Sequence, residues 1–359
     1  MLVIDPENNP FSYPALEFVT RSSALLHAIQ SVSASHEQYF PANSPIIALE
    51  ERGKAIACLR EEILQRHHAY HALFLTIMLL ALAQGADCDT KDYGKQHLFA
   101  ARALINCMLQ DTSTSLNNEP VARLCLGIYL YWDMCSSFLV DSWEPQGLDL
   151  VNISAAVHRM GDWYHPMYGT CTGLLLIIAN TGRYCRLMLD SPQDRDLVEE
   201  VVLEDQLITW KTSVQETGLG HLYEAFRNHG LIMLYRARVH AQSFCFTDAA
   251  ADPSEAQETL IEQYAEEAIR HLMQIPVTSY YLNFQALVLL AAGSELPGWD
   301  HFLRDQVRNR LRAIYSLNRL PANLLALQLL EEVWDARDSG NPSFWLLRML
   351  QKDWRLVLG

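Results

Sequence analysis

The chain of 359 residues is 50% hydrophobic and 19% charged, which allows a large buried core and excludes a chain that is disordered throughout. Its formal net charge of −15 at pH 7 disfavours direct binding to nucleic acid, because phosphate backbones attract basic surfaces. None of its eight cysteines forms a C-x-x-C pair, so we expect neither a disulfide framework nor a zinc site.

The N-terminal sequence does not read as a secretion signal, because no basic segment is followed by an apolar run. The most apolar stretch, residues 72–83, is shorter than the roughly 20 residues that a membrane-spanning helix needs. We therefore expect an intracellular protein, in the nucleus or the cytoplasm, that does not associate with a membrane.

Helical periodicity dominates the sequence and strand patterns are nearly absent, which predicts an all-α fold without a sheet. An extended, proline-containing lead-in is predicted for residues 1–15. In the first half of the chain, helices are expected over residues 16–39, 49–65, 71–84 and 93–109, and from Pro120 after a loop at 111–118.

The second half contains a helix that is apolar on every side, residues 174–178, flanked by Gly173 and Gly182. Such a helix is expected at the centre of a core, where glycines permit close approach of backbones. Ser191 and Asp252 are each followed by a proline and then by an acid, a pattern that predicts two helix N-caps.

The C-terminal region is predicted to form a helix from residue 321, a break at 335–341 and a last helix from 342 to about 357. The whole pattern predicts about a dozen packed antiparallel helices in a single domain over residues 1–359. The richest basic run carries Arg304, Arg308, Arg310 and Arg312 among apolar residues at helical spacing. We expect it to form the solvated face of one helix.

One candidate site centres on Asp133, a carboxylate inside an apolar helical stretch. A buried carboxylate must be paired, hydrogen-bonded or protonated, and Arg183 and Arg186 are the candidate partners. The pair is either a structural ion pair, which we favour, or an acidic group that lines a ligand cavity. The candidate ligand contacts here are the two arginines and the aromatic residues Tyr129 and Trp132, which precede Asp133.

A second candidate is the segment that carries Trp163, Tyr164 and His165. These side chains either dock the central segment of the fold or line the mouth of a pocket. Asp133 and His165 are the candidate acid and base if the protein is an enzyme.

Two histidine patterns are open to a chemical interpretation. His67 and His71 lie four residues apart and could seat a metal ion, but a helix junction with capping histidines is the better interpretation. His221 and Glu224 could form an acid–base pair, although a solvated helix face is more common. No nucleotide-binding, nucleophile-elbow or zinc-protease motif occurs, so we expect no cofactor and no metal.

Four groups of residues carry a resemblance to a known family. They are Asn9-Pro10-Phe11 with residues 23–29 and 33–36; residues 48–55 with 58–62; His165-Pro166-Met167-Tyr168-Gly169 with 174–178 and Gly182-Arg183; and residues 329–334 with Trp345 and 353–359. In order and spacing they resemble the helical regulatory domain of fungal binuclear zinc-cluster transcription factors, specifically the subfamily of acriflavine-sensitivity regulators. The resemblance covers nearly the whole chain. It implies an all-helical domain that regulates transcription by sensing signals or contacting other proteins.

The sequence departs from that family in one respect. The family's DNA-binding module uses six clustered cysteines to enclose two zinc ions, whereas here Cys58 is the first cysteine and Cys88 the next. We expect a regulator that binds a small apolar metabolite, a protein partner or a second copy of itself, without direct contact to nucleic acid. The alternatives are a start that lies upstream, or a pathway enzyme of fungal specialised metabolism that cyclises or isomerises a substrate in an apolar pocket.

Overall fold

The computed structural model describes residues 17–36, 44–64, 70–85, 90–110, 120–145, 147, 149–212, 217–245 and 254–359. Among these residues every regular element is a helix, and the single bridge pairs His165 with Gly169, so the prediction of an all-α fold is confirmed. The predicted lead-in 1–15, the loop 111–118 and the Asp252 cap lie outside the described residues.

The chain divides into two compact units, and α6 (Pro120–Ser136) contributes to both. The first unit holds the described residues up to Tyr129 together with residues 145–169, and the second holds 130–144 and 170–359. The expectation of a single domain over 1–359 stays a prediction.

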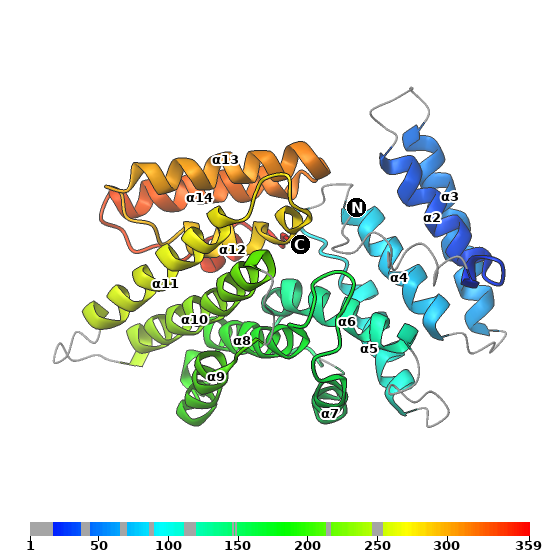
Figure 1. Cartoon of the computed structure of the whole chain (residues 1–359), viewed down its shortest axis with the longest axis horizontal. Helices are drawn as coiled ribbons and strands as arrows, with labels where there is room; N and C mark the ends of the chain where they lie inside the picture. Colours follow the sequence, from blue (N-terminus) through cyan, green and yellow to red (C-terminus); the bar gives the residue numbers. More distant parts are fainter. Residues whose placement is uncertain are drawn as a thin grey trace. The chain divides into compact units, whose positions relative to one another are not determined.

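The first unit is built around helical hairpins (Figure 1). Its other helices are α2 (Ser23–His36), α3 (Ser44–Leu64), α4 (Tyr70–Gly85), α5 (Lys95–Gln110) and α7 (Leu150–Met160). The carboxylate of Glu62, near the end of α3, accepts bonds from the Ser22 hydroxyl at 2.8 Å and the Ala24 amide at 3.0 Å. His27 meets Glu51 at 2.6 Å, so α2 and α3 run antiparallel.

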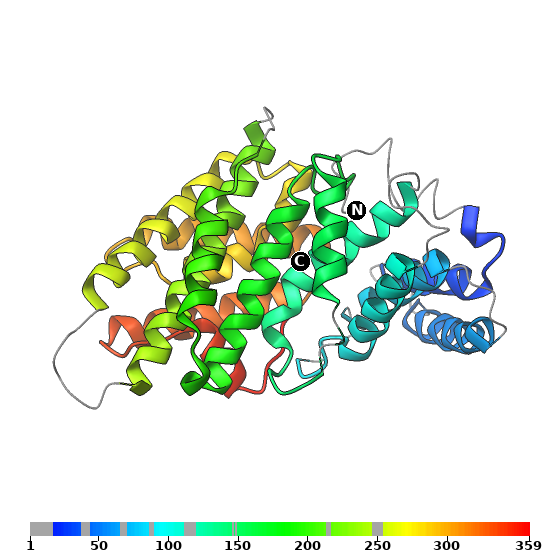
Figure 2. The same cartoon turned by 90° about the horizontal axis from the view of Figure 1, so that it is seen from below.

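The second unit packs around α10 (Thr217–Cys245), which contacts α8 (Thr172–Asp190), α9 (Leu197–Thr209), α11 (Ser254–Gln274) and α12 (Ala286–Gly293). Several of these helices lie side by side in Figure 2. Its remaining elements are α13 (His301–Asn318), α14 (Ala322–Asp338), α15 (Trp345–Gln351) and the 3₁₀ turns η2 (Ser137–Leu139), η3 (Pro192–Asp194) and η4 (Tyr280–Phe284).

The predicted core helix is α8, in which Leu174, Leu175, Leu176 and Ile178 are buried. A Cβ atom on Gly182 would lie 3.4 Å from the backbone nitrogen of Phe138 and closer still to the Ser137 side chain, so this glycine permits close packing of α8 on η2. Gly173 is different, because the nearest atom to a Cβ there would be 3.9 Å away.

Two predicted helix boundaries in the second unit are wrong. Ser191 makes no side-chain cap and begins only the turn η3, whereas Asp196 caps α9 by accepting from the amides of Val198 and Glu199. The last helix is also shorter than predicted, because α15 ends at Gln351. The predicted cap therefore lies five residues before the residue that caps α9.

Candidate functional site

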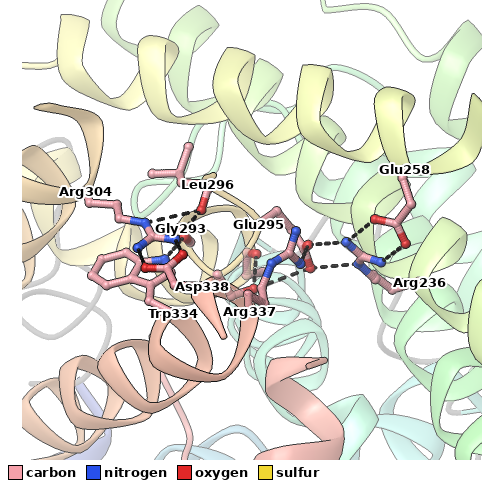
Figure 3. Close-up of polar contacts among 11 residues, drawn as sticks. Arg236, Glu258, Gly293, Glu295, Leu296, Arg304, Trp334, Arg337 and Asp338 are labelled. Carbon is pink, nitrogen blue, oxygen red and sulfur yellow. Dashed lines mark hydrogen bonds and ion pairs between the residues drawn. The ribbon is translucent and has the colours of Figure 1, made fainter. Parts of the chain in front are cut away.

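The prediction that the arginine run forms a solvated face is wrong for most of its members. Arg304 on α13 is buried and donates to both oxygens of Asp338, at 2.6 and 2.8 Å, and to the Leu296 carbonyl at 2.9 Å. Its guanidinium lies 5.0 Å from the centre of the Trp334 ring. Figure 3 shows Arg304 together with Trp334 and Asp338. Asp338 is remote in sequence, so periodicity alone does not reveal this pairing.

Two further arginines of the run are bound to the protein itself. Arg308 donates to the two oxygens of Glu331 at 2.6 and 2.8 Å. Arg310 is buried and donates to the Ile275 carbonyl at 2.8 Å. Arg312 is exposed. The run therefore contributes mainly to internal contacts of the second unit.

A buried network of charged side chains lies beside Arg304, Asp338 and Trp334 (Figure 3). Glu295 is 0% exposed and accepts from Arg236 of α10 and Arg337 of α14. Arg236 also donates to Glu258 of α11 at 2.5 and 2.7 Å. Burial alone would raise the pKa of Glu295, but the two guanidiniums outweigh it and lower that pKa. The network joins three helices to the end of α12.

The candidate Asp133 is 1% exposed and pairs with Arg183 at 2.7 Å. Arg183 also donates to the side chain of Asn180 at 2.6 Å. Arg186, the other candidate partner, binds the carboxylates of Asp190, at 2.9 Å, and Asp141 instead. The geometry at Asp133 is that of a hydrogen-bonded ion pair between α6 and α8.

The candidate His165 is completely buried, and both of its ring nitrogens are hydrogen-bonded. Nε2 lies 3.2 Å from the Leu124 carbonyl, and Nδ1 accepts from the Met167 amide at 3.2 Å. This arrangement assigns the proton to Nε2. Burial lowers the pKa of His165 to about 3, so the ring is neutral at physiological pH. Its position fits the docking role more closely than proton transfer.

The aromatic candidates have different surroundings. The Tyr129 hydroxyl is buried and accepts from Arg102 at 3.1 Å. Trp163 is half-buried and meets the His165 ring edge-on at 5.7 Å between ring centres, whereas Tyr164 is exposed. Trp132 is half-buried on α6.

The candidates are divided between the two units. The first unit holds Tyr129, Trp163, Tyr164 and His165, and the second holds Trp132, Asp133, Arg183 and Arg186. The structure joins Trp163 to His165 and Asp133 to Arg183. Their roles in ligand binding or catalysis stay predictions.

The histidine patterns give no metal cluster in the described part of the chain, where no three His, Cys, Asp or Glu side chains could hold an ion. His67 lies outside the described residues. His221 meets His271 through their Nδ1 atoms at 2.9 Å, while Glu224 pairs with Arg227 at 2.6 Å. The structure therefore gives His221 and Glu224 separate partners.

Sequence reasoning missed a set of buried polar atoms in the second unit. Gln285 is 0% exposed, and neither its side-chain oxygen nor its nitrogen has a hydrogen-bond partner among the described residues. His229 is 1% exposed, and its Nδ1 is also unpartnered there. Burial lowers the pKa of His229 to about 4, so this ring is neutral.

These two residues lie on elements that pack together. A Cβ atom on Gly218 of α10 would lie 3.2 Å from the Tyr281 ring of η4, and Arg236 of α10 binds Glu295 beyond α12. His229 is roughly three turns after Gly218 and two turns before Arg236, hence on the same face of α10. Gln285 joins η4 to α12. The sequence feature that could have indicated the burial of Gln285 is its position directly before α12, which is apolar throughout.

Among the described residues, no helix combines the length and the apolar character needed to cross a bilayer.

Comparison with known proteins gives one family. The family model described as "Fungal specific transcription factor domain" matches residues 1–359. Neither the curated proteins nor the solved structures give a match. Because the family match spans the entire sequence, the chain belongs to the fungal specific transcription factor domain family.

Proposed function

We propose that this chain regulates transcription from the nucleus by binding a small molecule or a protein partner, while DNA contact is left to another polypeptide segment. The order of the four resembling groups of residues supports placing it in the acriflavine-sensitivity-like subfamily. These 359 residues contain no six-cysteine cluster. Family membership supports the regulatory role, and the remainder is our proposal.

The observation that carries the proposal is the use of arginine inside the second unit. In the richest basic run, Arg304 and Arg308 are paired with carboxylates and Arg310 with a backbone carbonyl. Guanidiniums that already pair with carboxylates or carbonyls of their own chain contribute little to binding a phosphate backbone. Such binding requires a basic stripe on the surface. The net charge of −15 adds repulsion over the whole surface.

Tethering tests the proposal directly. The full chain is fused to an unrelated DNA-binding module and expressed with a reporter that carries the module's operator. We expect reporter transcription to change relative to the module alone, up or down. In parallel, the unfused chain is titrated against labelled duplexes at about 0.15 M salt, where only non-specific or no binding is expected. A reporter that is indifferent to the fusion, or a tight sequence-specific duplex complex, would contradict the proposal.

The small-molecule arm of the proposal is supported by Gln285 and His229. Buried polar groups nearly always have hydrogen-bond partners, so an unpartnered amide and an unpartnered neutral imidazole, on elements that pack together, are unused binding capacity. Both groups are uncharged, which favours an uncharged ligand with at least one donor and one acceptor. Thermal unfolding with a panel of neutral hydroxylated or carbonyl compounds tests this, with Gln285→Met as the matched control that should not respond.

No observation specifically favours the enzyme alternative. His165 has both nitrogens in hydrogen bonds, and Asp133 is paired with Arg183. A general acid or base must reach the proton that it transfers.

A further inference from the structure

The strongest feature that the proposed function leaves unexplained is the outer face of α9. The inner face of α9 is fixed by hydrogen bonds and buried side chains within the second unit. Glu200 accepts from Tyr184 at 2.8 Å and from Arg195 at 2.8 and 2.9 Å, and Leu203 and Leu207 are buried with it. Together with the Asp196 cap, these contacts fix the rotation of α9, and therefore the residues that its outer face presents.

That outer face is apolar. Val198 is 73% exposed and Val201 is 62% exposed. The exposed apolar side chains of the helix are Leu197, Val198, Val201, Val202 and Ile208. Since Val198, Val201 and Val202 stand at positions i, i+3 and i+4, they are neighbours on one surface of the helix. We name these five residues the α9 stripe.

Neither helix propensity nor the fold of the second unit explains the α9 stripe. Valine and isoleucine lose side-chain freedom in a helix, so they are poor choices for exposed helical positions. Exposed valines also gain no burial within their own unit. Contiguous apolar surface of this kind marks interaction sites, whereas single exposed apolar residues are ordinary.

The charges around the α9 stripe indicate what covers it. Asp205 is exposed and continues the stripe at the i+7 position from Val198, and Glu199 is exposed at its edge. Glu204 lies at the other edge, where it binds Arg238 at 2.7 Å. Two copies of this face would bring two sets of carboxylates, each with Asp205 and Glu199, into one interface, which is less favourable than pairing with a basic partner.

We propose that the α9 stripe docks an amphipathic helix of another protein, whose apolar residues are flanked by lysine or arginine. Apolar anchors at i, i+3, i+4 and i+7 of that helix would cover Val198, Val201 and Val202, and its basic flanks would meet Asp205 and Glu199. The inference rests on the proposed function, because it names the partner class through which the regulator acts.

A triple substitution tests this without disturbing the fold. Val198→Gln, Val201→Gln and Val202→Gln remove the apolar surface, and glutamine is a better helix former than valine. We expect the unfolding midpoint to stay level or rise, while the effect of the tethered chain on its reporter falls about tenfold. The matched control is Val277→Gln, Phe302→Gln and Leu317→Gln, three exposed apolar residues elsewhere in the unit. It should leave the reporter effect intact.

A direct binding measurement uses a designed peptide as the probe. Fluorescence anisotropy compares a labelled helical peptide with a leucine stripe and lysine flanks against the same stripe with glutamate flanks. The full chain should bind the lysine peptide in preference, and the triple variant should bind it about tenfold more weakly. Equal binding of the two peptides, or undiminished binding by the triple variant, overturns the proposal.

Two outcomes separate the inference from the proposed function. If the tethered wild-type chain changes transcription and the triple variant does so equally, the α9 docking site is wrong and the regulatory function stands. If the tethered wild-type chain is inert but the peptide results hold, the docking site stands and the regulatory function fails. A wild-type dimer by light scattering that the triple variant loses would overturn the partner assignment in favour of a second copy.

Discussion

Arg236 donates hydrogen bonds to the carboxylate of Glu295 from two of its nitrogens, Nε at 2.9 Å and Nη2, although Glu295 has no exposed surface. Arg337 approaches the same carboxylate from α14. Two guanidiniums around one buried carboxylate compensate its desolvation, and removing the carboxylate takes a counter-charge from both of them.

Replacing Glu295 by glutamine is therefore expected to destabilise the chain by about 3 kcal/mol, because the buried Arg236 and the half-buried Arg337 lose this counter-charge. Glu258→Gln is the matched control, since Glu258 binds the same Arg236 from a position one-third exposed to solvent. It should cost about 1 kcal/mol or less. Urea denaturation followed by circular dichroism measures both, and equal losses would show that burial of Glu295 is not what matters.

Lowering the pH should reduce the contribution of Glu295 to the stability of the fold. The folded-state pKa of Glu295 lies below its ordinary value of 4.5. A carboxylate of this kind stabilises the fold fully above its unfolded pKa and loses that contribution as pH falls through the folded value.

Mildly acidic pH is expected to weaken the chain through its buried histidines. His165 and His229 have folded pKa values of about 3 and about 4, against an ordinary value of 6.5. Between those limits the unfolded chain binds protons that the folded chain cannot, so stability falls as pH decreases. Each histidine should contribute a loss of about 2 kcal/mol between pH 7 and pH 5. Denaturation at several pH values checks this.

His229→Gln should remove one share of that pH dependence, and the exposed His158→Gln should leave it unchanged. A pH profile that is the same in all three proteins would mean that other groups control the acid response.

Features that depend on one segment of the chain could be predicted from the sequence, whereas features that depend on contacts between distant segments could not. Helix type and the core position of α8 depend on periodicity within one segment, so Leu174 and Leu175 could be placed correctly. The cap of α9 could not, because the pattern at Ser191 satisfies local rules yet begins only a short turn, whereas Asp196 makes the cap. The burial of Arg304 depends on Asp338, which the helix hairpin brings back to it. Of the candidate site, the Asp133–Arg183 pair was predictable from apolar context. The apolar helix after Gln285 indicates that this residue is buried, but it does not indicate that its amide lacks hydrogen-bond partners.

Gly182→Ala tests the tight packing of α8 against η2. The added methyl would lie 3.3 Å from the Ser137 Cβ and closer to its hydroxyl oxygen, so we expect a loss of about 1 to 2 kcal/mol from overpacking. Ser137 Oγ has no partner among the described residues, so Ser137→Ala alone should be nearly neutral and should reduce the loss in the double variant. Gly173→Ala is the control. It meets only ordinary contacts and should stabilise the helix.

Gln285→Met separates a ligand-binding amide from a structural one. If the amide makes no hydrogen bond in the free protein, replacing it with an apolar side chain of similar shape removes a desolvation penalty, and stability should rise by about 1 kcal/mol. The same variant should lose the thermal stabilisation that a neutral ligand gives the wild type, because the donor and acceptor are gone. A structural amide would give the opposite sign in the free protein, with a loss of about 1 to 3 kcal/mol. Asn283→Met, which alters a buried amide on η4 two residues earlier, controls for general repacking and should retain the ligand response. A rise in stability together with a loss of the ligand response is therefore expected only if the Gln285 amide binds a ligand. Thermal unfolding with and without the ligand measures both quantities and distinguishes a ligand-binding amide from a structural one.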